Sequence, residues 1–357
     1  MGKGSRPLSR TRLDVCTMEW TQFFLDLLSF SLKTGLIVLG FAAVILLITW
    51  ASLNGKVSPD QLKIENWSEK FFTQKDHLLS FTLSEKDLKK HRKEEKKSSK
   101  KADEISKPNL FVLQFDGDIK ASQTEALKNE ITAVLSVAKT QDEVLLILNS
   151  PGGVVHGYGL AAAELVRLRQ QSIPLTVSLD QIGASGGYMM ACTAQKIVCS
   201  PFAIVGSIGV LSQVPNFHRL LKKNDVDYHE YTAGKHKTTV SLLAEITPEK
   251  EAKFKEMLEA THELFKNHIK KYRPQLDFEK VATGEYWYGT QALELGLVDE
   301  IGTSQEILLK KSSTHKILFL KIEKKKKLSE KLMGALLGFK NNPLEMMAKA
   351  HPWDQIH

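Results

Sequence analysis

The sequence predicts an α/β domain with a parallel sheet, preceded by one transmembrane helix. From residue 110 onward, apolar runs of strand length alternate with segments whose apolar residues have helical spacing, which is typical of parallel α/β folds. The run EVLLIL at 143–148 is apolar throughout, as in a strand that is covered on both faces of its sheet. Before this alternation begins, residues 34–55 carry no charged side chain.

The uncharged segment 34–55 is long enough to cross a bilayer. About 20 helical residues, each rising 1.5 Å, span a hydrocarbon core of roughly 30 Å. Trp50 lies where an interfacial aromatic side chain belongs. A cleaved signal peptide is the alternative, but the apolar run is long for one and no A-x-A site closes it. We therefore expect a retained anchor.

Basic residues on either side of the anchor predict its orientation. Five precede the segment and three follow shortly after it, which favours an N-terminus inside the cytoplasm and the rest of the chain outside. They are Lys3, Arg6, Arg10, Arg12 and Lys33 before the segment, and Lys56, Lys63 and Lys70 after it. A start at Met18 would remove four of the first five and weaken this prediction.

Composition divides the chain into five parts. Residues 85–107 hold ten Lys/Arg and six Asp/Glu with almost no apolar side chain, so we expect a tether there, either disordered or a solvated helix. The expected parts are an N-terminal flank at 1–33, the anchor at 34–55, a charged tether at 56–107, a folded domain at 108–310 and a basic extension at 311–357. In the extension, four lysines precede an apolar stretch at 328–339 that suits an interfacial helix.

Charge and cysteine content exclude several classes of function. The net charge is +8, but the excess lysines are clustered rather than spread over one face, which argues against a nucleic-acid partner. The three cysteines include no CxxC pair and no Cys/His cluster with metal-ligand spacing. We expect neither a disulfide framework nor a metal or other cofactor.

Each element of the folded domain follows from a local pattern. Short apolar runs predict strands, and apolar residues that recur every three or four positions predict helices. The expected strands are 110–115, 143–148, 175–179 and 196–199, with 298–301 closing the fold; one more strand is expected at 316–321, in the extension. The expected helices are 124–137, 158–169, 185–193, 248–272 and 290–296.

The motif NSPGG at 149–153 directly follows the strand at 143–148. Gly152 and Gly153 have no side chain, so their N–H groups can approach a substrate carbonyl closely, as an oxyanion hole requires. An ordinary Pro-Gly turn is the alternative and is favoured when the motif is taken alone.

A second motif, GASGGY at 183–188, places Ser185 among small residues between a strand and a helix. It fits the G-x-S-x-G pattern of nucleophile elbows, in which the N–H of Gly186 would be a further oxyanion donor. Close packing of small residues at a helix N-terminus explains the motif equally well in isolation.

The third segment, TAGKHK, ends at Lys237, 52 residues after Ser185. A serine hydroxyl needs a base to take its proton, and a buried lysine favours the neutral amine that can do so. A solvated surface lysine is the default for any single Lys. Lys235 is a second candidate that the chemistry alone does not exclude.

In this order and spacing, NSPGG, ASGGYMMA and GKHK resemble the S49 family of peptidases, the relatives of signal peptide peptidase. Other family-like stretches are PFAIVGSIGV and RPQLDFEKVATGEYWYG, and the similarity is dense from about 108 to 304. The resemblance implies a crotonase/ClpP-like fold and a Ser–Lys dyad. The family serine falls on Ser185 and the family lysine on Lys237, not on Lys235.

The resemblance also implies the surroundings of the dyad. The oxyanion hole would be formed by Gly152, Gly153 and Gly186, and no cofactor would be needed. Long family members carry two copies of the unit and this chain carries one, which implies a ring-like homo-oligomer. The implied activity is hydrolysis of peptides or unfolded segments near a bacterial inner membrane, with the catalytic domain on the periplasmic side.

Other residues and functions compete with this interpretation. Ser207 lies between glycines but is expected to shape the cleft or help orient the lysine. His156 is expected to be structural, and Asp180 is expected to be a solvated carboxylate in a turn. Asp299 and His315 follow Ser185 in the chain order of a Ser-His-Asp esterase-type hydrolase. A CoA-using crotonase and a catalytically silent, peptide-binding membrane scaffold of the same fold are the remaining alternatives.

Overall fold

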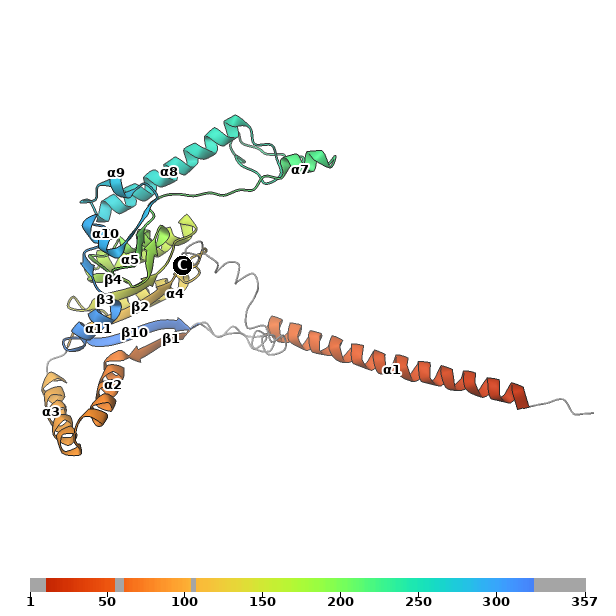
Figure 1. The fold of residues 1–357 in the computed structure, drawn as a ribbon, viewed down its shortest axis with the longest axis horizontal. Coiled ribbons are helices and arrows are strands. Elements are labelled where there is room, and N and C mark those ends of the chain that lie inside the picture. Colours follow the sequence, from red (N-terminus) through yellow and green to blue (C-terminus); the bar gives the residue numbers. More distant parts are fainter. Residues whose placement is uncertain (1–10, 55–60, 104–106, 324–357) are drawn as a thin grey trace, which may run out of the picture. The chain divides into compact units, whose positions relative to one another are not determined.

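The computed structural model describes residues 11–54, 61–103 and 107–323. These residues belong to two compact units, one holding the N-terminal helix and the other holding residues 61–323 (Figure 1). The apolar stretch at 328–339 and the lysine run before it lie outside the described residues.

The first unit contains α1 (Thr11–Asn54), one continuous helix. Its stretch Leu25–Val44 is long and apolar enough to cross a membrane, and none of it is buried. Twenty helical residues rise about 30 Å, which matches a hydrocarbon core. The predicted apolar helix is confirmed, although its apolar stretch begins nine residues before the predicted start at 34.

The second unit is built on a seven-stranded sheet. Six of its strands run parallel, and the edge strand β1 is antiparallel to β10. In spatial order the strands are β1 (Gln61–Asn66), β10 (Lys316–Glu323), β2 (Asn109–Asp116), β3 (Glu143–Asn149), β4 (Leu175–Leu179), β6 (Lys196–Cys199) and β9 (Glu300–Ile301). A parallel sheet of this kind confirms the predicted α/β class.

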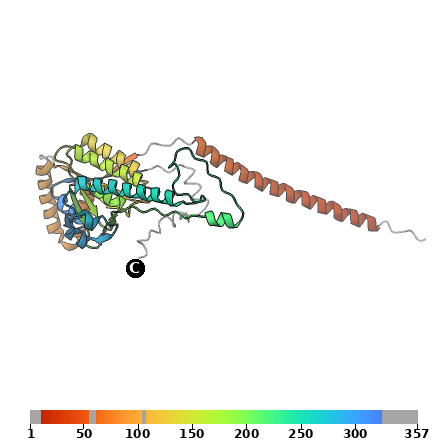
Figure 2. The same ribbon diagram turned by 90° about the horizontal axis from the view of Figure 1, so that it is seen from above.

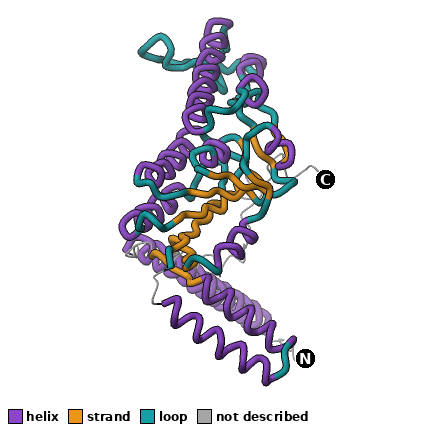
Figure 3. Tube along the Cα trace, turned by 90° about the vertical axis from the view of Figure 1, so that its left-hand side faces the viewer, coloured by secondary structure: helices purple, strands orange, loops and turns teal. Residues whose placement is uncertain are grey.

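Helices cover the sheet on both faces, because side chains of the central strands alternate between two cores. On β2, Phe111, Leu113 and Phe115 join the larger core, while Leu110 and Val112 join the smaller one. The larger core is closed by α4 (Thr124–Val137), α5 (Val155–Gln170), α6 (Gly186–Ala191) and α8 (Pro248–Tyr272). The smaller core is closed by α2 (Trp67–Thr82) and α11 (Ser304–Ser312). Figure 3 shows the strands enclosed by helices.

The sheet extends beyond both predicted borders of the folded domain, 108 and 310. Strand β1 lies before the first border and β10 lies after the second. The indole of Trp67 stacks on Phe319, with ring centroids 4.5 Å apart, which ties α2 to the sheet. Among the described residues of the expected tether at 56–107, the charged segment forms α3 (Glu85–Asp103), which is helical.

A second, smaller sheet supports the region around Ser185. It consists of β5 (Ile182–Ala184), β7 (Ile204–Gly206) and β8 (Tyr286–Tyr288). The short helices α9 (Phe278–Val281) and α10 (Gly289–Glu294) flank β8 in the sequence. Figures 1 and 2 place α7 (His218–Lys223) beyond the outer end of α8, away from the seven-stranded sheet.

Candidate active site

Ser185 occupies a strained turn between β5 and α6. Its φ is 50° and its ψ is −117°, a conformation that is uncommon for a residue with a side chain and that clusters at functional sites. The N–H of Ser185 donates to Gly206 O at 2.8 Å, and its carbonyl accepts from Met189 N–H at 2.9 Å. These bonds hold a half-buried serine on the strand–turn–helix junction that the G-x-S-x-G pattern predicts.

The NSPGG loop is bonded directly to the strand that leads into Ser185. Ser150 N–H donates to Ile182 O at 2.8 Å, and Ala184 N–H donates to Ser150 O at 3.0 Å. Gly152 has a φ of +91°, and a Cβ placed on it would lie 2.5 Å from the Gly186 nitrogen and 2.8 Å from the Ser185 Cβ. Two segments more than 30 residues apart in sequence therefore meet in backbone contact.

The three predicted oxyanion donors differ in how they are engaged. The N–H of Gly152 donates to Ser150 Oγ at 3.1 Å, inside its own loop. Over the described residues, the N–H groups of Gly153 and Gly186 make no hydrogen bond. Gly153 is exposed, and Gly186 is the first residue of α6, where an N–H has no partner within the helix. The arrangement thus leaves Gly153 and Gly186 free to bind an oxyanion.

Lys237 is not brought to Ser185 in the single chain. It is exposed, in the segment between α7 and α8, and its N–H donates to Gly234 O at 3.2 Å. Within the described part of the chain its ammonium has no hydrogen bond or ion pair, whereas Lys235 pairs with Glu249 at 3.1 Å. The burial expected of a general base is therefore absent at Lys237 in the single chain.

The segment 211–247 that carries Lys237 also exposes large apolar side chains. Tyr231 is 90% exposed and Leu211 is 80% exposed. The other exposed apolar residues of the segment are Val214, Phe217, Leu220, Val226, Tyr228 and Leu242. Such a density of exposed apolar side chains is typical of a surface that another protein covers.

Ser207 lies beside Ser185 at the end of the neighbouring strand. Strands β5 and β7 are parallel and pair Ala184 with Gly206, so the residue that follows each strand occupies the same edge. Ser207 also has a positive φ, 50°, and its N–H donates to Glu285 O at 2.7 Å. A role for Ser207 in shaping a cleft or orienting the lysine stays a prediction.

The other two polar candidates, His156 and Asp180, lie at different positions in the fold. His156 is exposed at the start of α5. Asp180 accepts hydrogen bonds from Ser178 Oγ at 2.7 Å, Ser304 N–H at 2.8 Å and Ser304 Oγ at 2.5 Å. It was expected to be solvated, but it joins the end of β4 to the start of α11.

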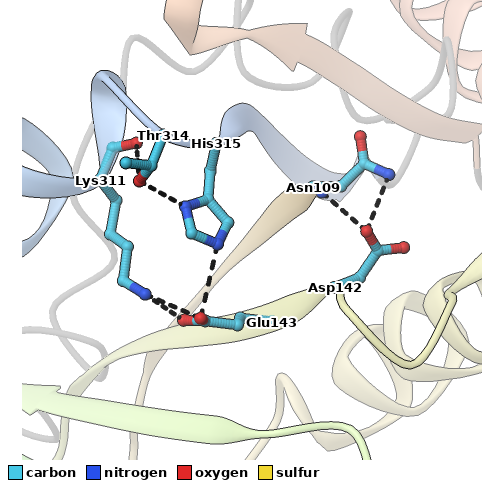
Figure 4. A network of polar contacts seen from close by, with 6 residues as sticks. All are labelled: Asn109, Asp142, Glu143, Lys311, Thr314 and His315. Carbon is cyan, nitrogen blue, oxygen red and sulfur yellow. Dashed lines mark hydrogen bonds and ion pairs between the residues drawn. The ribbon is translucent and has the colours of Figure 1, made fainter. Parts of the chain in front are cut away.

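The structure does not assemble the alternative Ser-His-Asp triad. Asp299 binds the guanidinium of Arg273 at 2.8 and 2.9 Å and also accepts from Ile197 N–H at 2.7 Å. Figure 4 shows His315 between Thr314 and Glu143, which lies at the amino end of β3. Ser185 borders the carboxyl end of that strand, which is about 20 Å away for seven residues at roughly 3.3 Å each.

Tyr158 is a further residue of the site that the sequence did not indicate. Its hydroxyl is 2.7 Å from Ser150 Oγ, and its ring lies against the backbone of Gly186. A tyrosine within an amphipathic helix has no local signal for this role, because the contact joins α5 to two turns. The only available hint was its position eight residues after the serine of NSPGG.

Comparison with known proteins identifies the family. A family description, Peptidase family S49, matches residues 167–317, and its companion, Peptidase family S49 N-terminal, matches residues 22–165. The Haemophilus influenzae protein named probable protease SohB is 48% identical over 316 residues, covering 85% of this chain and 90% of that protein. This chain belongs to peptidase family S49.

Two further comparisons are a relative of similar identity and a distant solved structure. A Buchnera aphidicola protein, also named probable protease SohB, is 51% identical over 231 residues, covering 65% of this chain and 69% of its own length. A solved structure of the 1510-N membrane-bound stomatin-specific protease, a K138A mutant with a substrate peptide, has 14% identity and a TM-score of 0.40. It covers 66% of this chain and 100% of that one, and so distant a likeness says nothing about the site.

Proposed function

We propose that this S49 peptidase is a membrane-anchored serine endopeptidase with Ser185 as nucleophile and Lys237 as general base. The observation that carries the proposal is the strained turn at Ser185, against which the backbone of Gly152 is packed. A serine presented in this way beside two free N–H groups suits attack on a peptide carbonyl.

The proposed reaction proceeds through an acyl-enzyme. Lys237 takes the proton of Ser185 Oγ as the oxygen attacks the carbonyl carbon, and the carbonyl oxygen becomes an oxyanion. The N–H groups of Gly153 and Gly186 bind that oxyanion. The protonated lysine then gives its proton to the departing amine. Water, activated by the same lysine, hydrolyses the ester and restores both side chains.

In this proposal, self-assembly buries Lys237, which is exposed in the single chain. When segment 211–247 docks on a neighbouring copy, its apolar side chains are covered and Lys237 loses water. Burial disfavours the ammonium form and leaves an amine that can accept a proton. The exposed Tyr231 and Leu211 support a docked state. In a ring-like homo-oligomer, segment 211–247 of every copy docks on the next copy.

The substrates proposed are peptides and unfolded polypeptide segments close to the membrane. The long apolar α1 supports a membrane anchor, and an assembled ring would admit extended chains and exclude folded ones. From the excess of basic residues before the anchor, we place the catalytic domain on the periplasmic side of a bacterial inner membrane.

Casein turnover by the detergent-solubilised full chain tests the dyad. We expect Ser185→Ala and Lys237→Ala to lower kcat at least 1,000-fold, on the order of the loss seen when one member of such a unit is removed. Lys235→Ala is the matched control, because it removes a neighbouring lysine of the same exposed segment, and it should retain activity. Wild-type turnover by Lys237→Ala would contradict the assigned base.

Labelling with a fluorophosphonate probe separates an enzyme from a silent scaffold. The probe should modify wild-type protein at Ser185 and leave Ser185→Ala unmodified. A folded, oligomeric wild-type protein that the probe does not modify would instead support a peptide-binding scaffold of the same fold.

The orientation is tested by a fusion of alkaline phosphatase after Glu323, behind the last strand. The fusion should be active, because this enzyme folds only outside the cytoplasm. An inactive fusion at wild-type expression would place the domain in the cytoplasm and leave the dyad proposal unaffected.

A further inference from the structure

One buried side chain contacts both backbone segments of the candidate oxyanion hole. Tyr158, on α5, is fully buried. Its ring lies against Gly186, where any Cβ would overlap Cγ and Cδ2 of the tyrosine, so the backbone of Gly186 is packed directly on this side chain. Phe115 contacts the ring from another side, with centroids 6.3 Å apart, and limits its movement.

The hydroxyl of Tyr158 reaches the NSPGG loop through Ser150. The distance from Tyr158 Oη is 2.7 Å to Ser150 Oγ and 2.8 Å to Asp118 O. Ser150 Oγ in turn lies 3.1 Å from the nitrogen of Gly152. Gly117 makes room for the pair, since a Cβ there would overlap both hydroxyl oxygens.

Chemistry fixes the direction of each hydrogen bond in the series that runs from Gly152 through Ser150 and Tyr158 to Asp118. The Asp118 carbonyl can only accept, so the single proton of Tyr158 Oη is donated to it. Ser150 Oγ must therefore donate its own proton to Tyr158 Oη. The lone pairs of Ser150 Oγ remain to accept the Gly152 N–H. Burial raises the pKa of Tyr158 to about 12, so the phenol keeps its proton at working pH.

We propose that Tyr158 is a positioning residue for the oxyanion hole. Its ring sets the place of the Gly186 N–H, and its hydroxyl, acting through Ser150, holds Gly152 so that the next N–H, that of Gly153, points into the site. One rigid side chain thereby fixes the spacing of two donors that come from different turns. The inference rests on the proposed function, because it assigns the geometry of the same site.

Two substitutions test the role of the Tyr158 hydroxyl separately from that of its ring. Tyr158→Phe keeps the ring under Gly186 and removes Oη, and Ser150→Ala removes the link to Gly152. In the detergent-solubilised full chain, each should lower kcat and the rate of fluorophosphonate labelling about 10- to 100-fold, since a misplaced donor costs part of the 100- to 1,000-fold of a lost one. KM should stay within about twofold. The double variant should be little worse than either single one, because both break the same chain.

Two other buried hydroxyls provide matched controls. Tyr188 Oη donates to Leu297 O at 2.8 Å, and Ser178 Oγ donates to Asp180 at 2.7 Å. Tyr188→Phe and Ser178→Ala remove comparable bonds that do not lead to the NSPGG loop. They should lower the thermal midpoint about as much as the test variants while leaving kcat unchanged.

The outcomes separate this proposal from the proposed function. Active Ser185→Ala protein would overturn both. If Ser185→Ala is inactive but Tyr158→Phe and Ser150→Ala keep wild-type kcat, only the positioning role is wrong. A loss of kcat that Tyr188→Phe and Ser178→Ala reproduce would also overturn it, because the effect would then be general destabilisation. If Tyr158→Phe does not fold, Ser150→Ala still decides, since it leaves the ring in place.

Discussion

At the scale of single residues, the site depends on positions where no side chain fits. Gly152 combines a positive φ with a Cβ direction that points at the Gly186 nitrogen, 2.5 Å away. Ser185 does carry a side chain at positive φ, and its two backbone hydrogen bonds hold it there. The strain is local to the turn where the proposed chemistry takes place.

Gly152→Ala should therefore inactivate the protein and destabilise it. The new methyl group would force apart the two backbone segments, and we expect kcat to fall at least 100-fold. Gly159→Ala is the matched control, because nothing lies within 4 Å of its Cβ position on α5. It should raise the free energy of unfolding by about 0.5–1 kcal/mol. Urea unfolding and casein turnover measure both, and full activity in Gly152→Ala would contradict the packing described.

Asp299→Ala should affect stability rather than chemistry. Its partner Arg273 is 4% exposed, and a buried guanidinium left without its carboxylate costs about 3 kcal/mol or more. Asp227→Ala, which breaks an exposed pair with Lys222, should cost less than about 1 kcal/mol. Urea unfolding measures both. A folded Asp299→Ala protein that no longer labels at Ser185 would revive the Ser-His-Asp alternative.

Part of the site could be predicted from residue types alone. Gly152, Ser185 and Gly186 stand in patterns whose chemistry is local, and the structure brings them together. The exposure of Lys237 could not be predicted, because it depends on what segment 211–247 packs against. Tyr158 could not be predicted either, since its role arises from contacts between turns that meet only in the folded chain.

At the scale of elements, local sequence signals specify both ends of helix α8. Thr247 caps the helix by accepting from Lys250 N–H at 3.3 Å, Pro248 follows at the first helical position, and the chain leaves the helix at Arg273. The predicted bounds are those observed. By contrast, the three-residue strands β5 and β7 were missed, because runs containing glycine lack a strand-like period.

Helix α8 also makes stability depend on pH. Burial lowers the pKa of His268 below its usual value near 6.5, and this outweighs the opposing effect of its hydrogen bond with Met189 O. Nearby Lys271 also lowers that pKa, and Tyr272 contacts the ring at a centroid distance of 5.2 Å. The unfolded chain thus binds a proton that the folded chain resists, so the free energy of unfolding falls as pH drops below about 6.5.

His268→Gln should reduce this acid sensitivity. Between pH 7.5 and 5.5 the variant should lose less unfolding free energy than the wild type, by up to about 1.4 kcal/mol for each pH unit below 6.5. His156→Gln, at an exposed histidine of α5, is the control substitution. Urea unfolding at both pH values measures the difference. If His268→Gln and the wild type lose the same unfolding free energy between the two pH values, this histidine titrates alike in the folded and the unfolded chain.

At the scale of the whole molecule, residues on both sides of the predicted domain complete its fold. Strand β1 pairs with β10 over six residues, and Trp67 stacks on Phe319 of the same strand. The sequence QLKIEN of β1 is too polar to be recognised as a strand, so only the sheet pairing shows that it belongs to the body.

A fragment that begins at Gln61 should therefore be more stable than one that begins at Pro108. The shorter fragment exposes the edge of β10 and the smaller core under α2, whose side chains include Trp67 and Phe71. Trp67 and Phe71 are partly buried, so each contributes part of the about 1.5–3 kcal/mol that full burial of such a side chain gives, and the lost strand pairing of β1 adds to this. We expect a thermal midpoint at least 10 °C higher for residues 61–323 than for 108–323. Equal midpoints, measured by circular dichroism, would show that β1 and α2 are dispensable.

The pairing of β1 with β10 has a consequence for the timing of biosynthesis. The first strand to leave the ribosome lies 250 residues before its partner, the last strand described. At about 5–20 residues per second, synthesis of that interval takes roughly 12–50 s. Throughout this delay the sheet lacks the strand that lies between β1 and β2. The newborn chain therefore exposes an unpaired sheet edge to proteases until β10 has been synthesised.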